Sequence, residues 1–457
     1  MAEEIEASTG LQLVAGMGAG KTAGTLTALV DLFAARTIRA AIILAPVRVA
    51  LHTWPNEISS WEHTCDLDYV VLSGSPEKRL KLLRESHQVY ICSIDSLVWL
   101  IDALRKFAKD DPRWDFLLID ELSRFKSPRG ERAKKLNRFV GRFGAVVGIT
   151  GTPRPNGWED QWMPLQIVSA GEAWQPTSGF YAWRREHFRP LDFHGYNWQP
   201  HSHAIPYFRK VIDTWTLTIP PDAAVDVPFN MGAAFDTVVP LTRAQKEDLA
   251  SLEKELLVEL GAEGTDLLDP SEELVVALSQ ATASGKMSQI CQGFLYRDGE
   301  TVQTYGKAKL QALEDMLAAL DGENAIIVYN YRHDLEVLKK HLPQARWVDQ
   351  KQTDQEFVDL IRACERGEVQ YLLAHPANLG HGVDGLQKGF SRMIWYQTTF
   401  SAELTAQMIK RIARPGQTEP VFVHRILADH WLERLRISRV ESKMADEAEF
   451  ISTLRRI

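Results

Sequence analysis

The sequence has few cysteines, no long apolar stretch and no excess of basic residues, and each absence excludes a class of protein. Its 457 residues include four cysteines, which are far apart and form no Cys-x-x-Cys pair: Cys65, Cys92, Cys291 and Cys364. A disulfide framework and a cysteine-based zinc site are therefore not expected. No apolar run reaches the roughly 18 residues of a membrane-spanning helix, and the acidic N-terminus lacks the apolar segment of a signal peptide. We expect a protein of a reducing cytoplasm without a membrane span.

The charge balance is acidic, with a formal net charge of -8. A chain that coats nucleic acid with a uniformly basic surface is excluded, so any contact with nucleic acid requires local basic patches. Hydrophobic residues make up 45% and charged residues 25% of the chain, which excludes wholesale disorder.

Short apolar segments alternate with helical ones in two parts of the chain. Predicted strands lie at 11–14, 40–44, 69–72, 89–92, 116–119 and 145–149, and again at 325–329, 370–374, 393–396 and 420–426. This alternation predicts parallel sheets with helices on both faces. We expect an α/β protein with two parallel-sheet domains, at residues 1–152 and 301–457. Between them, residues 153–300 read as an irregular insertion followed by a helical connector.

A glycine-rich segment, Ala15–Thr22, follows a predicted strand and precedes a predicted helix. Its glycines are Gly16, Gly18 and Gly20. They would let backbone N–H groups and the helix N-terminus face phosphate oxygens. Lys21 is expected to reach the β- and γ-phosphates of a nucleotide, and the Thr22 hydroxyl to bind Mg²⁺. Ala15 stands where the strict pattern has glycine.

Two acids end the apolar strand at 116–119, and both suit nucleotide chemistry. Asp120 is placed to bind Mg²⁺ at the carboxyl end of a parallel strand. Glu121 suits a general base that orients the attacking water. The alternative is a pair of solvated acids closing a strand.

A polar turn and a pair of arginines complete the predicted chemistry. The turn, Thr150–Pro153, again follows a predicted strand. Arg411 and Arg414 are three residues apart, so on a helix they would share one face. Two guanidinium groups there could stabilise charge on a γ-phosphate if the domains close. The alternative is a solvated basic helix.

Taken in order, these segments resemble the motifs of superfamily 2 helicases, and more closely the SNF2-like group of DNA-dependent ATPases. The matching segments are Ala15–Thr22 (motif I), Asp120–Ser123 (II), Thr150–Pro153 (III), Ile326–Asn330 (IV), Asn378–Leu386 (V) and Gln407–Gln417, which has the spacing Q-x-x-x-R-x-x-R-x-G-Q. The resemblance implies two RecA-like domains in tandem and the use of ATP with Mg²⁺. It also implies catalytic roles for Gln407, Arg411 and Arg414, and nucleotide contacts at Gly382 and Asp384.

Other segments extend or limit the resemblance. Ala45-Pro46, with Trp54, Glu57 and Trp61 beyond it, is similar to motif Ia, whose family role is contact with the nucleic-acid backbone. Residues 180–188 look like an insertion of phage-encoded members. The family usually has a helix with an adenine-contacting glutamine upstream of motif I. The sequence before motif I leaves no room for it, and Gln12 falls in the predicted first strand.

Two local groups of basic residues are candidates for phosphate contacts. The first follows motif II: Arg124, Lys126, Arg129, Arg132, Lys134, Lys135 and Arg138. The second lies near the C-terminus: Arg425, Arg434, Arg436, Arg439 and Lys443. The alternative for the first group is a solvated helix face. Trp183 and Trp198 are expected to be buried rather than to stack on bases, and the nearby histidines 194, 201 and 203 are not expected to bind a metal.

The sequence therefore predicts an ATP-dependent DNA translocase or helicase that contacts duplex or single-stranded DNA through phosphates. We expect a monomer that acts in a bacterial cell, encoded by a phage, with replication or recombination proteins as partners. The alternatives are an RNA helicase and a nucleotide-dependent DNA-binding assembly factor that does not hydrolyse ATP. Whether the protein separates strands or only moves along them is not legible in the sequence.

Overall fold

The structure, a computed structural model, divides the chain into two units, and each is described by itself. The description covers all residues except 17–18, 108–112, 177–178, 191–197, 220–230, 260–281, 298–299, 350–351, 380–384, 415 and 455–457. Unit 1 comprises residues 1–189, 199–226 and 445–457, and unit 2 comprises residues 190–198 and 227–444. This division shares residues 153–300, predicted as an insertion and connector, between the two units.

Unit 1 is built on a seven-stranded sheet in the order β3-β4-β2-β5-β6-β1-β9, in which every pairing is parallel. Its strands are β1 (Gly10–Ala15), β2 (Ala41–Ala45), β3 (Tyr69–Val71), β4 (Val89–Ser93), β5 (Phe116–Asp120), β6 (Ala145–Thr150) and β9 (Thr216–Ile219). The residues of β2 are all buried, as expected for a strand covered on both faces. The carboxyl ends of β1, β5 and β6 therefore meet at one edge of the sheet.

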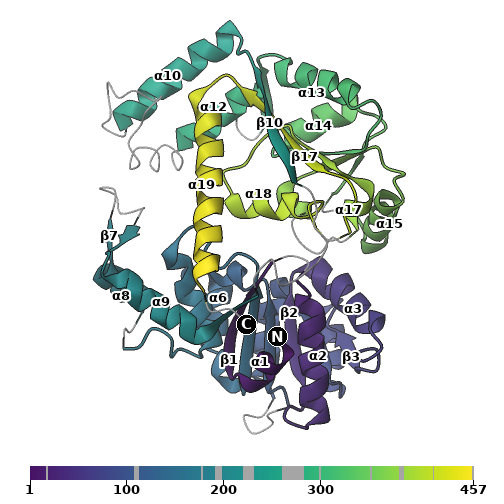
Figure 1. The fold of residues 1–457 in the computed structure, drawn as a ribbon, viewed down its shortest axis with the longest axis vertical. Helices are drawn as coiled ribbons and strands as arrows, with labels where there is room; N and C mark the ends of the chain where they lie inside the picture. The colour runs from purple at the N-terminus through teal and green to yellow at the C-terminus, as the bar shows by residue number, and fades with distance from the viewer. Residues whose placement is uncertain are drawn as a thin grey trace. The chain divides into compact units, whose positions relative to one another are not determined.

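The helices of unit 1 cover both faces of this sheet (Figure 1). They are α1 (Ala2–Ala7), α2 (Lys21–Ala34), α3 (Trp54–Ser60), α4 (Pro76–Arg84), α5 (Leu97–Leu104), α6 (Glu131–Asn137), α7 (Trp162–Val168), α8 (Phe180–His187) and α9 (Ala204–Trp215). One core contains Ile5 of α1, Leu29 of α2 and Trp54 of α3 packed on the strands. The short helix α1 was not predicted, and it contains no glutamine.

The tryptophan-rich segment of unit 1 packs as a cluster of aromatic rings. Trp183 is fully buried, and its ring centroid lies 5.1 Å from that of Trp174 and 5.2 Å from that of Phe208. Such tilted contacts between buried rings add stability beyond the area that they bury. The prediction of burial is confirmed for Trp183, whereas Trp198 is only half-buried.

Unit 2 is built on a six-stranded sheet in the order β10-β17-β16-β13-β15-β14, again parallel throughout. Its strands are β10 (Met231–Val239), β13 (Ala325–Val328), β14 (Arg346–Trp347), β15 (Tyr371–Ala374), β16 (Arg392–Trp395) and β17 (Val421–Ala428). Two separate cores lie on the two faces of this sheet. Unit 2 also contains the antiparallel pair of β11 (Phe294–Arg297) with β12 (Glu300–Thr304). A second short pair, β7 (Phe188–Pro190) with β8 (Trp198–Pro200), has residues in both units.

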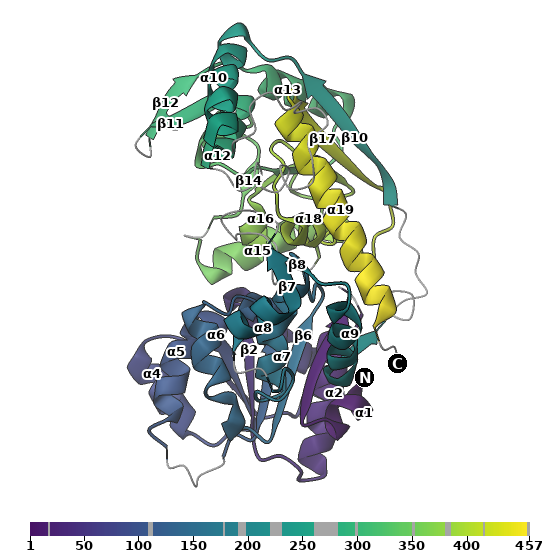
Figure 2. The same cartoon turned by 90° about the vertical axis from the view of Figure 1, so that its left-hand side faces the viewer.

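The helices of unit 2 follow the same alternation. They are α10 (Arg243–Glu259), α12 (Thr282–Gln292), α13 (Ala308–Ala319), α14 (Arg332–His341), α15 (Asp354–Glu365), α16 (Pro376–Leu379), α17 (Leu386–Gly389), α18 (Ala402–Ile409) and the part of α19 (Trp431–Thr453) up to Met444. Helices α10 and α12 pack together beside the hairpin β11–β12 (Figure 2). Among the helices that the structure describes, none is long and apolar enough to cross a membrane.

The predicted fold class, two RecA-like α/β domains with parallel sheets, is confirmed. The predicted strands appear with boundaries that differ by a few residues at most. The strands β9, β10 and β14 were not predicted, and each is an edge or near-edge strand of its sheet. Gln12 lies in β1 and is fully buried, as the sequence indicated.

Candidate nucleotide site

The glycine-rich loop of unit 1 connects the carboxyl end of β1 to the first residue of α2. Gly20 has φ +67°, a left-handed conformation that glycine adopts without strain, and Lys21 begins the helix. The Lys21 Nζ donates to the carbonyl oxygens of Ala15 at 3.0 Å and Gly16 at 3.1 Å. The lysine therefore lies across the loop in which a phosphate would bind. Gly18 lies outside the described residues.

The acidic pair lies at the carboxyl end of β5, which is separated from β1 in the sheet by β6. Asp120 ends β5, and Glu121 comes directly after it with φ +65° and ψ +58°. A residue other than glycine rarely adopts this left-handed backbone conformation, which is strained. Strained residues of this kind are concentrated at functional sites. Burial and the neighbouring Glu121 carboxylate raise the pKa of Asp120 to about 6, although Lys21 and a hydrogen bond from Trp54 act against them.

Trp54 holds the Asp120 carboxylate in place. Its indole Nε1 donates to Asp120 Oδ2 at 3.1 Å, and the tryptophan side chain is fully buried. The sequence had associated Trp54 with a motif that contacts nucleic acid, but a fully buried ring has no surface to offer such a partner. Trp61 of the same segment is 46% exposed and donates to Glu57 at 2.9 Å. Sequence reasoning missed the role of Trp54, which depends on a contact between residues distant in the chain.

The polar turn after β6 lies against the glycine-rich loop. A Cβ atom on Gly151 would lie 3.4 Å from the Ala15 carbonyl oxygen and 3.9 Å from Lys21 Nζ. The turn is fixed from behind by Gln161, whose Nε2 donates to the Pro153 carbonyl oxygen and whose Oε1 accepts from buried Gln12 at 3.2 Å. The structure thus brings the first three predicted motifs together at one edge of the sheet.

The donors and acceptors at this edge fit a nucleotide with Mg²⁺. A lysine and a helix N-terminus suit phosphate oxygens. The raised pKa of Asp120 marks a carboxylate whose charge is poorly balanced within the protein, and a bound cation would balance it. Asp120 and Thr22 would be the metal ligands from this chain, and both are partly accessible.

The predicted arginines lie in unit 2, just beyond α18. This helix ends at Ile409, and Arg411 and Arg414 lie in the turn that follows. The prediction that the two arginines share one face of a helix is therefore wrong. Pro415 and Gly416 follow this turn, and because a residue before proline avoids the helical region and Gly416 has φ +89°, a helix could not continue past Arg414.

The side chain of Gln417 organises this arginine turn. Its Nε2 donates to the carbonyl oxygens of Phe390 at 2.9 Å and Ile412 at 3.1 Å. Arg411 is buried and Arg414 is half-buried, while Gln407 on α18 is 3% exposed. Gly382 and Asp384, the other predicted nucleotide contacts, lie outside the described residues.

The first basic group is displayed on the surface of unit 1 around α6. Five of its members are exposed: Arg124, Arg129, Arg132, Lys134 and Arg138. Arg132 pairs with Asp95 at 2.7 Å, and Arg129 donates to the hydroxyl of exposed Tyr181 at 2.9 Å. The group therefore offers several exposed cations, one of which already has an acidic partner.

The second basic group is largely committed to contacts within the protein, which corrects the prediction of a phosphate-binding surface there. Arg436 is 2% exposed. Arg425 pairs with Asp236 at 2.5 Å and Glu441 at 2.7 Å, and Arg434 pairs with Asp429 at 3.1 Å. Arg425 of β17 reaches Asp236 of β10 and Glu441 of α19, which are contacts between distant segments that the sequence pattern did not reveal. Among the residues that the structure describes, no three or more histidines, cysteines and acids are grouped so that they alone could hold a metal ion.

Two tandem RecA-like units, with a loop lysine and an acidic pair at one sheet edge, define the class of this protein. Residues 1–210 match the family model of the SNF2-related domain. A putative protein p41 of Acyrthosiphon pisum secondary endosymbiont phage 1 is 32% identical over 97% of this chain and 94% of its own length. The chain belongs to the SNF2-related family, as its motifs had suggested, and it has a phage relative.

More distant relatives are chromatin-remodelling proteins. The ISWI chromatin-remodeling complex ATPase ISW1 of Saccharomyces cerevisiae is 22% identical, over 94% of this chain and 37% of its own length. The chain thus spans about two fifths of that relative. The Sulfolobus solfataricus SWI2/SNF2 ATPase core in complex with dsDNA is 18% identical, with a TM-score of 0.41, and the match covers 99% of this chain and 92% of that one.

Proposed function

We propose that this protein is an ATP-dependent DNA translocase or helicase. The observation that carries the proposal is the arrangement at one sheet edge of unit 1, where Lys21, Asp120 and the turn at Gly151 gather. Membership of the SNF2-related family supports it. The family's members include proteins named as ATPases of chromatin-remodelling complexes.

In the proposed reaction, unit 1 binds ATP and supplies the groups that act on its phosphates. Lys21 and the N–H groups at the start of α2 hold the phosphates, and Thr22 and Asp120 hold Mg²⁺. A metal ion held by these two residues would supply positive charge beside the phosphates. Glu121 accepts a hydrogen bond from the attacking water and orients it.

Unit 2 contributes positive charge in this proposal. Arg411 and Arg414 stabilise charge on the γ-phosphate, which is the role that arginine fingers have in phosphoryl transfer. Gln417 fixes the turn that carries them through its bonds to two carbonyl oxygens. Gln407, buried on α18 before this turn, contributes from the same segment.

The proposed polymer is DNA, contacted mainly through its phosphates. The exposed basic residues around α6 support this part of the proposal, because lysines and arginines on a surface give affinity that is independent of sequence. A motor that moves over any sequence needs such contacts rather than base readout. We propose that it acts in the cytoplasm of a bacterial cell that carries the phage.

The direct test is an ATPase assay with duplex DNA, single-stranded DNA and RNA. DNA should stimulate hydrolysis and RNA should not, and a strand-displacement assay would separate unwinding from translocation. Lys21→Ala should reduce turnover to below about one hundredth of the wild type. Lys81→Ala, on the exposed face of α4, is the matched control and should leave turnover unchanged.

Each outcome decides between the candidate functions. Stimulation by RNA alone would replace DNA with RNA as the polymer. Binding of ATP without turnover on any nucleic acid would favour an assembly factor. If Lys21→Ala hydrolyses ATP like the wild type, the site itself is misassigned.

A further inference from the structure

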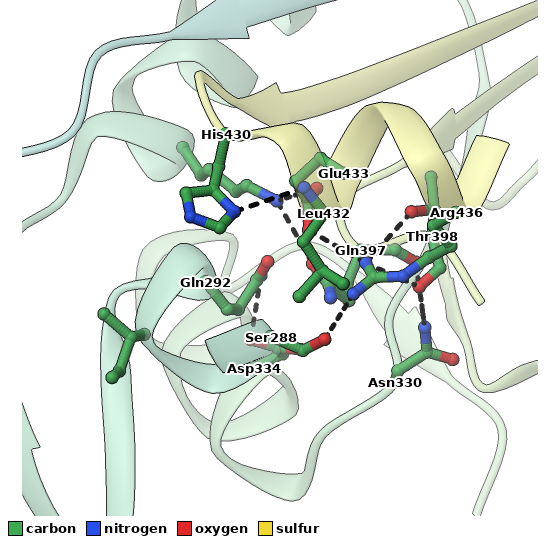
Figure 3. A network of polar contacts seen from close by, with 12 residues as sticks. Ser288, Gln292, Asn330, Asp334, Gln397, Thr398, His430, Leu432, Glu433 and Arg436 are labelled. Carbon is green, nitrogen blue, oxygen red and sulfur yellow. Dashed lines mark hydrogen bonds and ion pairs between the residues drawn. The ribbon is translucent and has the colours of Figure 1, made fainter. Parts of the chain in front are cut away.

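Unit 2 contains a cluster of three charged side chains that are almost completely withdrawn from water. Lys309 of α13 pairs with Glu433 of α19 at 3.2 Å, and Arg436 of α19 pairs with the other oxygen of Glu433 at 2.9 Å. Their side chains are 3%, 0% and 2% exposed. Figure 3 shows Glu433 and Arg436 at the centre of a wider network of hydrogen bonds. We call Lys309, Glu433 and Arg436 the buried ion cluster.

Both cations of the cluster also bond to the loop that follows β16. Lys309 Nζ donates to Gln397 Oε1 at 3.1 Å. Arg436 Nη1 donates to the Thr398 hydroxyl at 3.2 Å and to the Thr398 carbonyl oxygen at 3.4 Å. Since both cations reach this loop while sharing one carboxylate, the cluster joins α13 and α19 to residues 397 and 398.

A third side chain, Asn330, also bonds to this loop. Asn330, which follows β13, donates from Nδ2 to the carbonyl oxygens of Gln397 at 3.1 Å and Thr398 at 2.8 Å. Both backbone carbonyl groups therefore have fixed donors. Side chains from three elements or their flanks, Asn330 after β13, Lys309 on α13 and Arg436 on α19, therefore bond to the loop between β16 and α18.

This loop leads directly into the helix that precedes the arginines. Ser401 caps α18, accepting a hydrogen bond from Leu404 N at 3.2 Å. Arg411 and Arg414 follow the end of α18. An α-helix transmits a change at its start to its end with little loss, because its backbone bonds make it stiff over two turns.

Stability alone does not account for a buried cluster of this kind. Withdrawing three charges from water is unfavourable, and apolar side chains of similar volume often stabilise a core as well or better. Charged groups differ from apolar ones in their directionality, because each bond fixes a donor against an acceptor. In this cluster, the hydrogen bonds of Lys309 and Arg436 end on Gln397 and Thr398, in the loop that precedes α18.

We propose that Lys309, Glu433 and Arg436 are positioning residues for the arginine turn, acting through the loop at residues 397–401 and helix α18. The inference rests on the proposed function, in which Arg411 and Arg414 act on the γ-phosphate. The cluster touches neither nucleotide nor DNA. Its loss lowers the rate of hydrolysis and leaves the binding of ATP by unit 1 unchanged.

Two variants separate positioning from simple support of the fold. Gln397→Met removes the loop's bond to Lys309 while leaving both ion pairs in place. The triple variant Lys309→Met, Glu433→Leu and Arg436→Met replaces the cluster with apolar side chains of similar size, which should keep unit 2 folded. Arg332→Ala, which breaks an exposed ion pair on α14, is the matched control.

The measurements are kcat and KM for ATP with saturating DNA, together with urea unfolding of the full chain. For Gln397→Met and the triple variant we expect kcat to fall about tenfold to a hundredfold, with KM within about twofold of the wild type. Arg332→Ala should match the wild type. If the triple variant does not fold, Gln397→Met alone decides, because it leaves the ion pairs intact.

Arg414→Ala in the same assay separates failure of this inference from failure of the proposed function. If Arg414→Ala is inactive but the folded variants keep wild-type kcat, the positioning role is overturned and the arginine role stands. If Arg414→Ala keeps wild-type kcat, the arginine role fails and the positioning inference fails with it.

Discussion

Asp120 in unit 1 is half-buried and Glu433 in unit 2 is fully buried, and their surroundings shift the pKa values of the two carboxylates in opposite directions. At Asp120, burial and the adjacent Glu121 carboxylate raise the pKa to about 6. At Glu433, burial opposes ionisation, but Lys309 and Arg436 outweigh it and lower the pKa. Among the residues that the structure describes, Lys21 is the cation that acts on Asp120 and it does not offset the burial, whereas Glu433 has two cations that do.

The difference separates a site that is built to receive a cation from a cluster that is already complete. An acid whose charge is poorly balanced destabilises the folded state, and such a position persists where the chemistry needs it. A buried acid between two cations gives a fixed geometry and has no capacity left for a ligand. A buried or half-buried acid therefore has a different role in each unit. The balance of charge around it indicates catalysis in unit 1 and positioning in unit 2.

The sharpest way to break the comparison is Asp120→Asn. The amide keeps the size of the side chain and removes its charge, so ATP turnover should fall at least about a hundredfold. Because the unfavourable proximity to Glu121 is also removed, urea unfolding should show stability that is unchanged or higher. A large loss of stability would mean that Asp120 is a structural acid like Glu433.

The opposite result is expected for Glu433→Gln. Removing this charge leaves Lys309 and Arg436 buried without a counter-charge, which should destabilise unit 2 by about 3–5 kcal/mol. The loss should change little with salt, because buried pairs are poorly screened. Glu247→Gln, in the exposed pair with Arg243, is the control and should leave the unfolding midpoint unchanged. A stable Glu433→Gln protein would remove the contrast between the two carboxylates.

Asp334, at the start of α14, is another carboxylate with a shifted pKa. It extends the comparison to the pH dependence of stability. Burial raises its pKa to about 7, although hydrogen bonds from Tyr331 N and Gln292 and the charge of Lys309 act against it. Since the pKa is raised on folding, the folded state binds more protons than the unfolded chain between about pH 4 and pH 7. The contribution of Asp334 to stability is therefore full below about pH 4 and is lost progressively as the pH rises from there to about 7.

Asp334→Asn should remove this dependence. Relative to the wild type, the variant should gain on the order of 2 kcal/mol between pH 5 and pH 8, measured by urea unfolding at each pH. Gln292 can accommodate the amide by rotating its own, because its Oε1 has no hydrogen-bond partner among the described residues. Parallel pH profiles for the two proteins would show that Asp334 is ionised throughout.

The sequence predicted the elements of this fold better than the contacts between them. The strands of both sheets are short apolar runs bounded by polar residues, so their positions follow from local pattern. Strand β10 lies in a segment without clear periodicity, and its pairing with β17 depends on residues nearly 200 positions away. Helix α1 has only six residues, too few for a periodic signal.

The candidate site shows the same division. Lys21, Asp120 and Glu121 are legible because each stands at a strand end within a motif of fixed spacing. The prediction that Arg411 and Arg414 lie on a helix was wrong, because the spacing of residues does not show where a helix ends. Lys309 and Glu433 are 124 residues apart, and no local pattern links them.

The smallest expected effect concerns the bond that orients Asp120. Trp54→Phe removes the Nε1 donor and keeps an aromatic ring, so it should cost about 1 kcal/mol of stability from the lost bond and reduced packing. Without this donor the Asp120 carboxylate is less well oriented, and the Mg²⁺ concentration for half-maximal ATPase should rise about tenfold. Trp99→Phe, on α5 in the same unit, should leave the Mg²⁺ requirement unchanged. An unaltered requirement in Trp54→Phe would show that Asp120 needs no partner to hold its position, and the indole would then serve packing alone.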